Sequence, residues 1–377
     1  MCSGTYAENL SVVSAVNVHG GFSCSSWSYA ASNKVEIVAQ TDAPALTLKG
    51  MTSPVFVSDV QLVAKSNAGK GRSSVAVFVA SSVKVNFNRV KIEAKAGGDA
   101  EDGKNGSFTY PAGSVLNGGA AGFDRSGLGG TTGTCPGGGT STGGVGHRLE
   151  TPGTDGTPSP LGGALGSLVS NSCNGMGPTG PVGADGVPAR DADPGAGAQV
   201  LGSLTAEEWA GKSGDNGSNG TPGGGGGGGG GLLMSGGAGG GGGAGGCGGA
   251  GGAGGGPGGS SIALMVFESD VALVACALVA AEAKPGGAGG AGQTGQPGGA
   301  AGNRFNNACN GGSGAKGGNG GRGGGGAGGV SAGIVWSGAN APTGSDISIT
   351  RSLAPAAGGG TGAQKGADGM SADVIKI

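Results

Sequence analysis

Glycine recurs at every third position through long stretches of this chain, and this period limits the possible folds more than any other feature. The longest runs cover residues 236–254 and 311–329, and a shorter one covers 286–298. A period of three matches an extended left-handed helix that rises about 3.1 Å per residue, so that one residue in three lies on each edge. Glycine edges let two such helices approach until Cα–H groups meet carbonyl oxygens. The runs therefore predict several threefold helices, parallel or antiparallel, folded back within one chain.

Residues 222–259 contain nine consecutive glycines followed by a period-three run. The nine glycines alone fit a flexible linker. Because "GGAGGGGGAGGCGGAGGAGGG" continues them, we instead expect one or two helices of a bundle, with Leu232, Leu233 and Met234 as an apolar turn between them. Collagen is the main rival, but its triplet runs are long and rich in proline.

The overall composition argues against disorder. Glycine and proline supply 99 and 17 of the 377 residues, a share that is typical of fibrous or low-complexity chains. Disordered chains, however, combine high net charge with low hydrophobicity, whereas this chain has a net charge of −2 and 36% apolar residues. The charges form no basic patch for nucleic acid, and no apolar run reaches the roughly 18 residues of a membrane helix. We expect an ordered protein with neither kind of partner.

Residues 35–96 have a different pattern, with short β-branched runs in which buried and exposed positions alternate. Shifting this segment by 30 residues superposes it on itself, so that Val55 falls on Val85 and Thr47 on Val77. A repeat of 20 to 50 residues made only of strands is the signature of a solenoid, in which each coil buries its face on the next.

Related coils return after the glycine-rich stretches, at 260–284 and at 330–357, where Ile334, Trp336, Ile347 and Ile349 take the apolar positions. The simplest topology stacks the coils directly and loops the glycine-rich stretches out on one side. We therefore expect an all-β protein with almost no α-helix. The expected division is coils at 1–96, 260–284 and 330–357, glycine-rich insertions at 97–259 and 285–329, and a glycine-rich tail with a final strand at 358–377.

Three resemblances sharpen this expectation. The segment "GTYAENLSVVSAVNVHGGF" at 4–22 resembles the opening coil of right-handed parallel β-helix proteins of the pectin-esterase and pectate-lyase-like superfamily. The glycine-rich interruptions resemble those of large surface or secreted β-helix proteins of myxobacteria. The tracts themselves are similar to the polyglycine II helix bundles of T-even-like phage tail-fibre adhesins and of snow-flea antifreeze protein. These resemblances imply a right-handed parallel β-helix with an inserted polyglycine II helix bundle.

The seven cysteines are widely spaced and form no CxxC pair, which argues against zinc and for disulfides made in an oxidising compartment. We expect an extracellular or cell-surface protein. Cys276 lies in "VALVACALV" and is expected to be a buried free thiol. The expected pairs are Cys2 with Cys24, Cys135 with Cys173, and Cys247 with Cys309.

Catalytic groups are scarce. The 30-residue repeat places Asp59 above Arg89, which fits a catalytic carboxylate with its cation or an exposed ladder pair; the second is favoured, because no other carboxylate falls in line. His19 and His147 are the only histidines, and both are expected at the surface. A His-based general base or metal cluster therefore has nothing to build from.

Three further motifs carry weaker signals. Asp99, Glu101, Asp102 and Asn105 could hold Ca²⁺ in one loop, but their spacing misses the EF-hand and a solvated acidic turn is favoured. The stretch "AEEWAGKS" at 206–213 satisfies a loose Walker A pattern, which we interpret as a chance match, because Thr205 and Glu208 form a capping box that would start any helix before the lysine. The dispersed aromatics are expected to pack in the core or loops, although an exposed one could bind a sugar: Trp27, Tyr29, Tyr110, Trp209 and Trp336.

The favoured function is a non-enzymatic extracellular or cell-surface module, structural or adhesin-like, that presents a rigid glycine-rich surface to a glycan or cell-surface receptor. It needs no cofactor. The alternatives are a polysaccharide lyase or esterase, which requires two carboxylates and a Lys or Arg on one solenoid face, and an ice-binding protein. Since "CSGTYAENLSV" after Met1 lacks the features of a signal peptide, we expect these residues to be a fragment of a longer protein.

Overall fold

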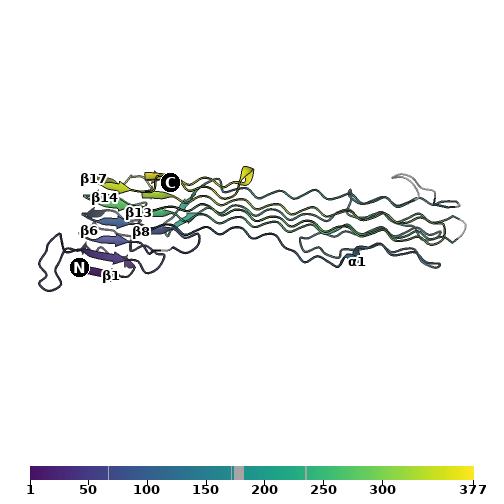
Figure 1. The fold of residues 1–377 in the computed structure, drawn as a ribbon, viewed down its shortest axis with the longest axis horizontal. Coiled ribbons are helices and arrows are strands. Elements are labelled where there is room, and N and C mark those ends of the chain that lie inside the picture. Colours follow the sequence, from purple (N-terminus) through teal and green to yellow (C-terminus); the bar gives the residue numbers. More distant parts are fainter. Residues whose placement is uncertain (67, 171, 174–181, 234–235) are drawn as a thin grey trace.

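The chain forms three parallel β-sheets from which long glycine-rich segments extend to one side (Figure 1). A computed structural model describes residues 1–66, 68–170, 172–173, 182–233 and 236–377. Successive strands enter the first, second and third sheet in turn, and neighbouring strands within each sheet run parallel. Among these residues the helices are limited to α1 (Gly113–Leu116) and one 3₁₀ turn (Gly362–Gln364). The expectation of an all-β chain with parallel sheets is confirmed.

The sheets are listed here in their hydrogen-bonded order. The first contains β1 (Gly4–Ala7), β4 (Val35–Val38), β7 (Gln61–Val63), β10 (Lys91–Glu93), β15 (Ala277–Val279) and β18 (Ser348–Thr350). The second contains β19 (Ser371–Lys376), β16 (Ser331–Ser337), β13 (Ser261–Phe267), β8 (Ser74–Ala80), β5 (Leu46–Lys49) and β2 (Leu10–Val12). The third contains β17 (Thr343–Ser345), β14 (Val271–Val274), β9 (Val85–Asn88), β6 (Val55–Ser58) and β3 (Val18–His19). A separate antiparallel hairpin joins β11 (Gly202–Leu204) and β12 (Trp209–Gly211).

One hydrophobic core collects the alternate side chains of all three sheets, including Ile92, Val77 and Phe87. The second sheet is also buried on its outer face, where Phe78 and Met265 pack with Trp209 of the hairpin. Because successive side chains of a strand point to opposite faces, a strand covered on both sides reads as a continuous apolar run. This explains the uninterrupted burial of β8 and shows that the hairpin, although it lies within a glycine-rich insertion, covers a sheet.

Between the coil of β5, β6 and β7 and the coil of β8, β9 and β10, the 30-residue repeat is correct in two sheets and wrong by one residue in the other. It does not extend back to β4, which pairs with β7 at an offset of 25 residues. Val55 pairs with Val85, as expected, but Thr47 pairs with Phe78 and not with Val77. The reason lies at the corner between the second and third sheets. Five residues, 50–54, separate β5 from β6, whereas four residues, 81–84, separate β8 from β9. A corner can gain a residue without disturbing either core, because its backbone lies at the surface.

The corner from the third sheet to the first repeats one backbone conformation. Asp59, Arg89, Ala275 and Asp346 occupy it in successive layers, with φ between 49° and 60°. Non-glycine residues seldom adopt this left-handed conformation, so its recurrence indicates that the corner geometry is imposed by the stacked strands. The same repetition places side chains of successive layers above one another.

The glycine-rich segments all leave from the remaining corner, between the first and second sheets. They follow β10, β15 and β18, and they return to β13, β16 and β19. Since these strands are neighbours within their sheets, the segments start and end next to one another and run alongside each other (Figure 1). We call the array formed by the segments between β10 and β13, between β15 and β16, and between β18 and β19 the rod; the hairpin of β11 and β12 is not part of it.

Hydrogen bonds between rod segments recur at every third residue. Gly223, Gly226 and Gly229 donate their N–H groups to Gly246, Gly243 and Gly240, so that these two segments run antiparallel. Residues 240–258 run parallel to 309–327, with bonds such as Gly243 N–H to the Gly312 oxygen at 2.9 Å. The stretch 222–259 therefore folds as two antiparallel segments. Leu232 is buried at the turn between them, Leu233 is exposed, and Met234 lies outside the described residues.

The nine-glycine run lies in the interior of the rod, where every one of its residues is buried. Its successive N–H groups bond to different neighbours: those of Gly225, Gly226 and Gly227 reach the carbonyl oxygens of Thr157, Gly243 and Ala184. A Cβ atom on any of the three would lie 2.0 to 2.1 Å from a carbonyl oxygen. Glycine is therefore required on all three edges of this segment, which is why the run shows no period.

The segment that follows carries side chains on one edge only. Ala238, Ala244, Cys247 and Ala250 are its side-chain-bearing residues between 237 and 250, and their positions differ by multiples of three. Ala244 donates its N–H group to the Leu116 carbonyl at 2.7 Å, and the side chain of Cys247 bonds to Cys135. The period of three in the sequence therefore reflects the crowding of the other two edges of this segment, where only glycine fits.

The six disulfide cysteines pair differently from two of our three expectations. Cys2 bonds to Cys24 as expected, but Cys135 bonds to Cys247 and Cys173 bonds to Cys309, so the pairs 135–173 and 247–309 are wrong. Gly240 donates to the carbonyl of Cys309, which places Cys247 seven residues further along its segment. At about 3.1 Å per residue that separation is roughly 22 Å, far beyond disulfide reach. Cys276 is a buried free thiol, and its burial raises its pKa.

Asparagine and aspartate side chains close the outer edges of the rod. Asn216 Oδ1 accepts the N–H of Gly254 at 2.8 Å, and Asn219 Oδ1 accepts that of Gly251 at 2.9 Å. The same contact joins Asp102 to Ala288, Asn105 to Ala291, Asn117 to Ala300, Asp185 to Ser313 and Asp191 to Asn319. An outer segment has N–H groups that no further segment can accept, and these side chains satisfy them.

Candidate functional site

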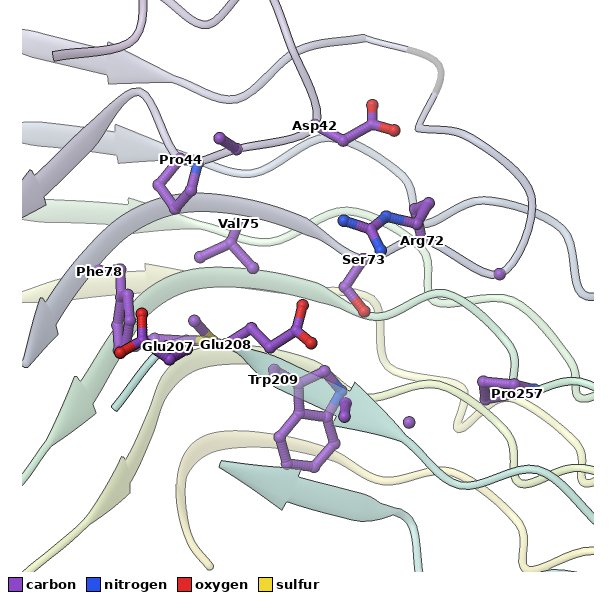
Figure 2. A pocket seen from close by; sticks show the side chains of 15 residues that line it. Asp42, Pro44, Arg72, Ser73, Val75, Phe78, Glu207, Glu208, Trp209 and Pro257 are labelled. Carbon is purple, nitrogen blue, oxygen red and sulfur yellow. The ribbon is translucent and has the colours of Figure 1, made fainter. Parts of the chain in front are cut away.

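A cavity of about 360 Å³ lies where the hairpin meets the second sheet and the base of the rod (Figure 2). Its apolar walls come from Val75, Phe78 and Met265 of the sheet and from Trp209 of the hairpin. Asp42, Arg72, Glu207 and Glu208 supply its charged groups, from two loops and the hairpin turn. It combines polar and apolar walls, and concave sites of this kind are the usual place for a ligand.

The hairpin turn has replaced the helix start that we considered for "AEEWAGKS". Thr205 Oγ1 accepts the N–H groups of Glu207 and Glu208 at 3.2 Å, as in a capping box, but Thr205 N–H bonds to the Glu208 carbonyl and the chain turns back as β12. Trp209 Nε1 then donates to Ser260 Oγ at 3.1 Å. The burial of the indole against the sheet outweighs the local helix signal, and residues 202–211 form a hairpin instead of the strand–loop–helix unit that phosphate binding requires.

The charges around this cavity are unequally satisfied. Lys65 pairs with Asp42 at 3.2 Å, and Lys49 pairs with Glu207. The side chains of Arg72 and Glu208 have no ion pair or hydrogen bond to the residues that the structure describes, and Figure 2 shows both beside Ser73. The cavity can therefore offer one cation and one carboxylate to a polar ligand. No local pattern in the sequence points to this group, because a loop, a corner and a hairpin more than a hundred residues away supply it.

The predicted Asp59–Arg89 pair is present. Arg89 Nε donates to Asp59 Oδ1 at 2.7 Å, and Nη2 donates to Oδ2 at 2.8 Å, a bidentate geometry that raises the pKa of the guanidinium. Arg89 Nη2 also lies 3.4 Å from the hydroxyl of Tyr29. The pair lines a second cavity, of about 320 Å³, together with Lys34, Gln61 and Lys91.

The two histidines lie far apart in the fold. His19 is exposed at the end of β3, as expected. His147 is only partly exposed, because its backbone joins Gly229 and Gly239 in the rod, and its Nδ1 is buried with no hydrogen-bond partner among the described residues. The expectation of a surface position is wrong for His147, since the rod packs around its backbone.

The acidic loop at 97–106 forms part of the rod. Asp102 and Asn105 use their side-chain oxygens to accept N–H groups of Ala288 and Ala291, and the backbone oxygen of Glu101 accepts the N–H of Gly256. Asp99 contributes its carbonyl to Gly71. No group of three or more His, Cys, Asp or Glu side chains in the described part of the chain could hold a metal ion. Of the four side chains considered for Ca²⁺, those of Asp102 and Asn105 thus have a structural partner already.

The aromatic residues divide into buried and exposed ones. Trp209 and Trp336 are buried, and the Lys376 ammonium lies 4.7 Å from the centre of the Trp336 ring. Tyr110 donates its hydroxyl to the Thr294 carbonyl. Trp27 and Tyr29, by contrast, are 62% and 52% exposed, on the loop that the Cys2–Cys24 disulfide holds.

No protein-family model, curated protein or solved structure matches this chain. Within the described ranges, no helix is long and apolar enough to cross a membrane. We therefore infer function from the geometry of the rod and of the two cavities.

Proposed function

We propose that this chain is a non-enzymatic extracellular or cell-surface module, adhesin-like in character, that presents a rigid glycine-rich rod to a glycan or cell surface. In this proposal the three sheets form a right-handed parallel β-helix, and the rod is a polyglycine II helix bundle. The strand order, with each sheet visited in turn, and the threefold repeat of hydrogen bonds between segments support these two assignments.

The observation that carries the proposal is the satisfaction of the rod's backbone by its own segments. N–H groups of consecutive residues in the nine-glycine run bond to different segments, and Asn and Asp side chains take up N–H groups at the outer edges. A protease must first unfold a segment locally to bind it, and each local opening here breaks bonds to several neighbours. Such a rod suits display outside the cell.

The three disulfides support the proposed location. Two of them, Cys135–Cys247 and Cys173–Cys309, join segments of the rod, and Cys2–Cys24 closes the first loop. Structural disulfides of this kind form and persist in oxidising compartments, such as the outside of the cell.

The test uses the whole chain, oxidised and fluorescently labelled. We expect saturable retention on a glycan array or on glycan-bearing cells, and survival of the rod under a protease that digests the reduced, urea-unfolded chain. The reduced, alkylated and unfolded chain is the control for unspecific capture. A folded module that binds none of the glycans or cells would contradict the adhesive role.

A polysaccharide lyase or esterase is the second candidate, and the cavity beneath the hairpin favours it. Asp42, Glu207 and Glu208 line this cavity together with Arg72, which meets the minimum set of two carboxylates and a cation. We expect Glu208→Gln to abolish any release of reducing ends or of ester acids, while Glu150→Gln, an exposed residue of the rod, leaves it unchanged. Absence of turnover by the unmodified chain on a panel of polysaccharides would remove this candidate.

A further inference from the structure

The second cavity lies at the corner between the third and first sheets, beside the loop that carries the exposed aromatics. Lys34, Arg89 and Lys91 line it, together with one carboxylate, that of Asp59. Asp59 is fully engaged by the two bonds from Arg89. Positive charges therefore outnumber negative charges at the cavity wall.

The neighbouring charged residues do not cancel this excess of positive charge. Lys91 pairs with Glu93 at 2.8 Å, but Glu93 also binds Lys95, and the two lysines together lower the pKa of that carboxyl. The three side chains thus carry a net positive charge. The ammonium of Lys34 has no ion pair within the described residues, and the nearby Glu36 accepts a hydrogen bond from Thr5 Oγ1 on β1 at 3.3 Å.

The aromatic loop next to the cavity is held rigidly. Phe22 packs against Tyr29, edge to face, with ring centroids 5.8 Å apart, and Cys2–Cys24 anchors the start of the loop. Gly21 has a φ of 84°, and a Cβ there would lie 2.6 Å from the Tyr29 ring, so glycine is needed for the ring to pack. The Tyr29 hydroxyl then meets Arg89 at the cavity, and Trp27 lies exposed in the same loop.

We propose that this cavity, formed by Lys34, Asp59, Gln61, Arg89 and Lys91 beside Tyr29 and Trp27, binds a saccharide that carries a sulfate or phosphate ester. The lysines and Arg89 suit the anionic oxygens of the ester, since charge-assisted hydrogen bonds are the strong ones. Gln61 offers hydrogen bonds to ring hydroxyls. The exposed aromatic faces suit the apolar C–H face of a sugar ring. This inference rests on the proposed adhesive function and assigns it a site and a ligand class.

The test compares Lys34→Gln/Lys91→Gln with the unmodified chain and with Lys104→Gln/Lys212→Gln, which removes the same charge from exposed lysines of the rod. The probes are a heparin-derived hexasaccharide, its desulfated counterpart, an oligosaccharide bearing mannose 6-phosphate, and inorganic sulfate. Titration calorimetry gives the affinity. We expect a loss of at least about tenfold for the ester-bearing probe in the first variant and little change in the second.

A separate aromatic variant, Trp27→Ala, checks that a sugar is bound and not an anion alone. We expect it to weaken the binding of the ester-bearing saccharide and to leave the binding of inorganic sulfate unchanged. The desulfated hexasaccharide should bind weakly to every variant. Which ester binds more tightly, sulfate or phosphate, identifies the source of the anionic group.

Three results would overturn the site: equal affinity in the unmodified chain and the Lys34/Lys91 variant, equal affinity for the desulfated probe, or an equal loss in the Lys104/Lys212 control, which would mean unspecific attraction. Retention on cells distinguishes this outcome from failure of the adhesive function. If the Lys34/Lys91 variant still adheres to glycan-bearing cells, the module is adhesive and the site lies elsewhere. If the unmodified chain does not adhere, the proposed function itself fails.

Discussion

Gly226 and Gly312 lie in such close contact that a Cβ atom on Gly226 would come within 2.1 Å of the Gly312 carbonyl oxygen. The two residues are 86 positions apart in the sequence. Contacts of this kind, repeated along the rod, replace the side-chain core of an ordinary domain. They make the rod sensitive to a single methyl group in its interior.

Gly226→Ala is expected to destabilise the rod by at least about 1–3 kcal/mol, the usual cost of overpacking, because two segments must move apart along bonded backbone. Denaturant unfolding monitored by circular dichroism measures the change. Gly113→Ala is the matched control, since a Cβ there meets nothing within 4 Å. Equal stability of the two variants would show that the interior segments are not in close contact.

The two rod disulfides are expected to contribute more than Cys2–Cys24, because they close loops of 112 and 136 residues instead of 22. In the chain-entropy account a loop of that length is worth about 4–5 kcal/mol. We expect Cys135→Ser/Cys247→Ser to lower the melting temperature more than Cys2→Ser/Cys24→Ser. Peptide mapping under non-reducing conditions checks the pairing itself, and a 247–309 peptide would refute the observed register.

Acid should open the outer edges of the rod first. Asp191 accepts the backbone N–H of Asn319, and Asp368 accepts that of Gly358, and these hydrogen bonds lower the pKa of both carboxyls. A carboxyl whose folded pKa is depressed stabilises the fold above its unfolded pKa, near 4, and this contribution disappears as the pH falls through the folded value.

We therefore expect the amide signals of Asn319 and Gly358 to shift in NMR spectra below about pH 4, while those of interior glycines such as Gly226 stay unchanged. Asp191→Asn keeps the accepting oxygen and should remove the pH dependence at Asn319. A shift that persists in this variant would assign the effect to another group.

The Asn-Gly pairs of the rod are expected to resist deamidation. The reaction requires the glycine nitrogen to attack the asparagine side-chain carbonyl. In the rod, Gly217 N–H is bonded to Gly252 and Asn216 Oδ1 to Gly254, each at 2.8 Å, so both reactants are held apart in an extended backbone. Mass spectrometry should find deamidation at Asn216 slowed at least about tenfold relative to the urea-unfolded chain, as an opening free energy of about 1.4 kcal/mol would require. Equal rates would mean that this segment is open in solution.

Local sequence predicted the elements well where their cause is local. The alternation in 35–96 predicted strands, and the 30-residue repeat placed Asp59 beside Arg89. It could also have placed Gln61 beside Lys91, and so the wall of the second cavity. The hairpin was not predicted. It forms because it covers the outer face of the second sheet, and no local pattern at 202–211 reveals that contact.

The sequence by itself determined that this chain has two kinds of structure, since glycine at every third position allows close approach of backbones and alternating apolar residues bury one face of a strand. Only the tertiary structure decided which segments lie side by side and at what height. Cys247 bonds to Cys135, 112 residues away in the sequence, and not to Cys309. The interior run lost its period because its contacts are with segments that are distant in the sequence, such as the one that contains Gly312. An edge of glycines fits many partners equally well, so the register comes from the sheets that fix the ends of each segment.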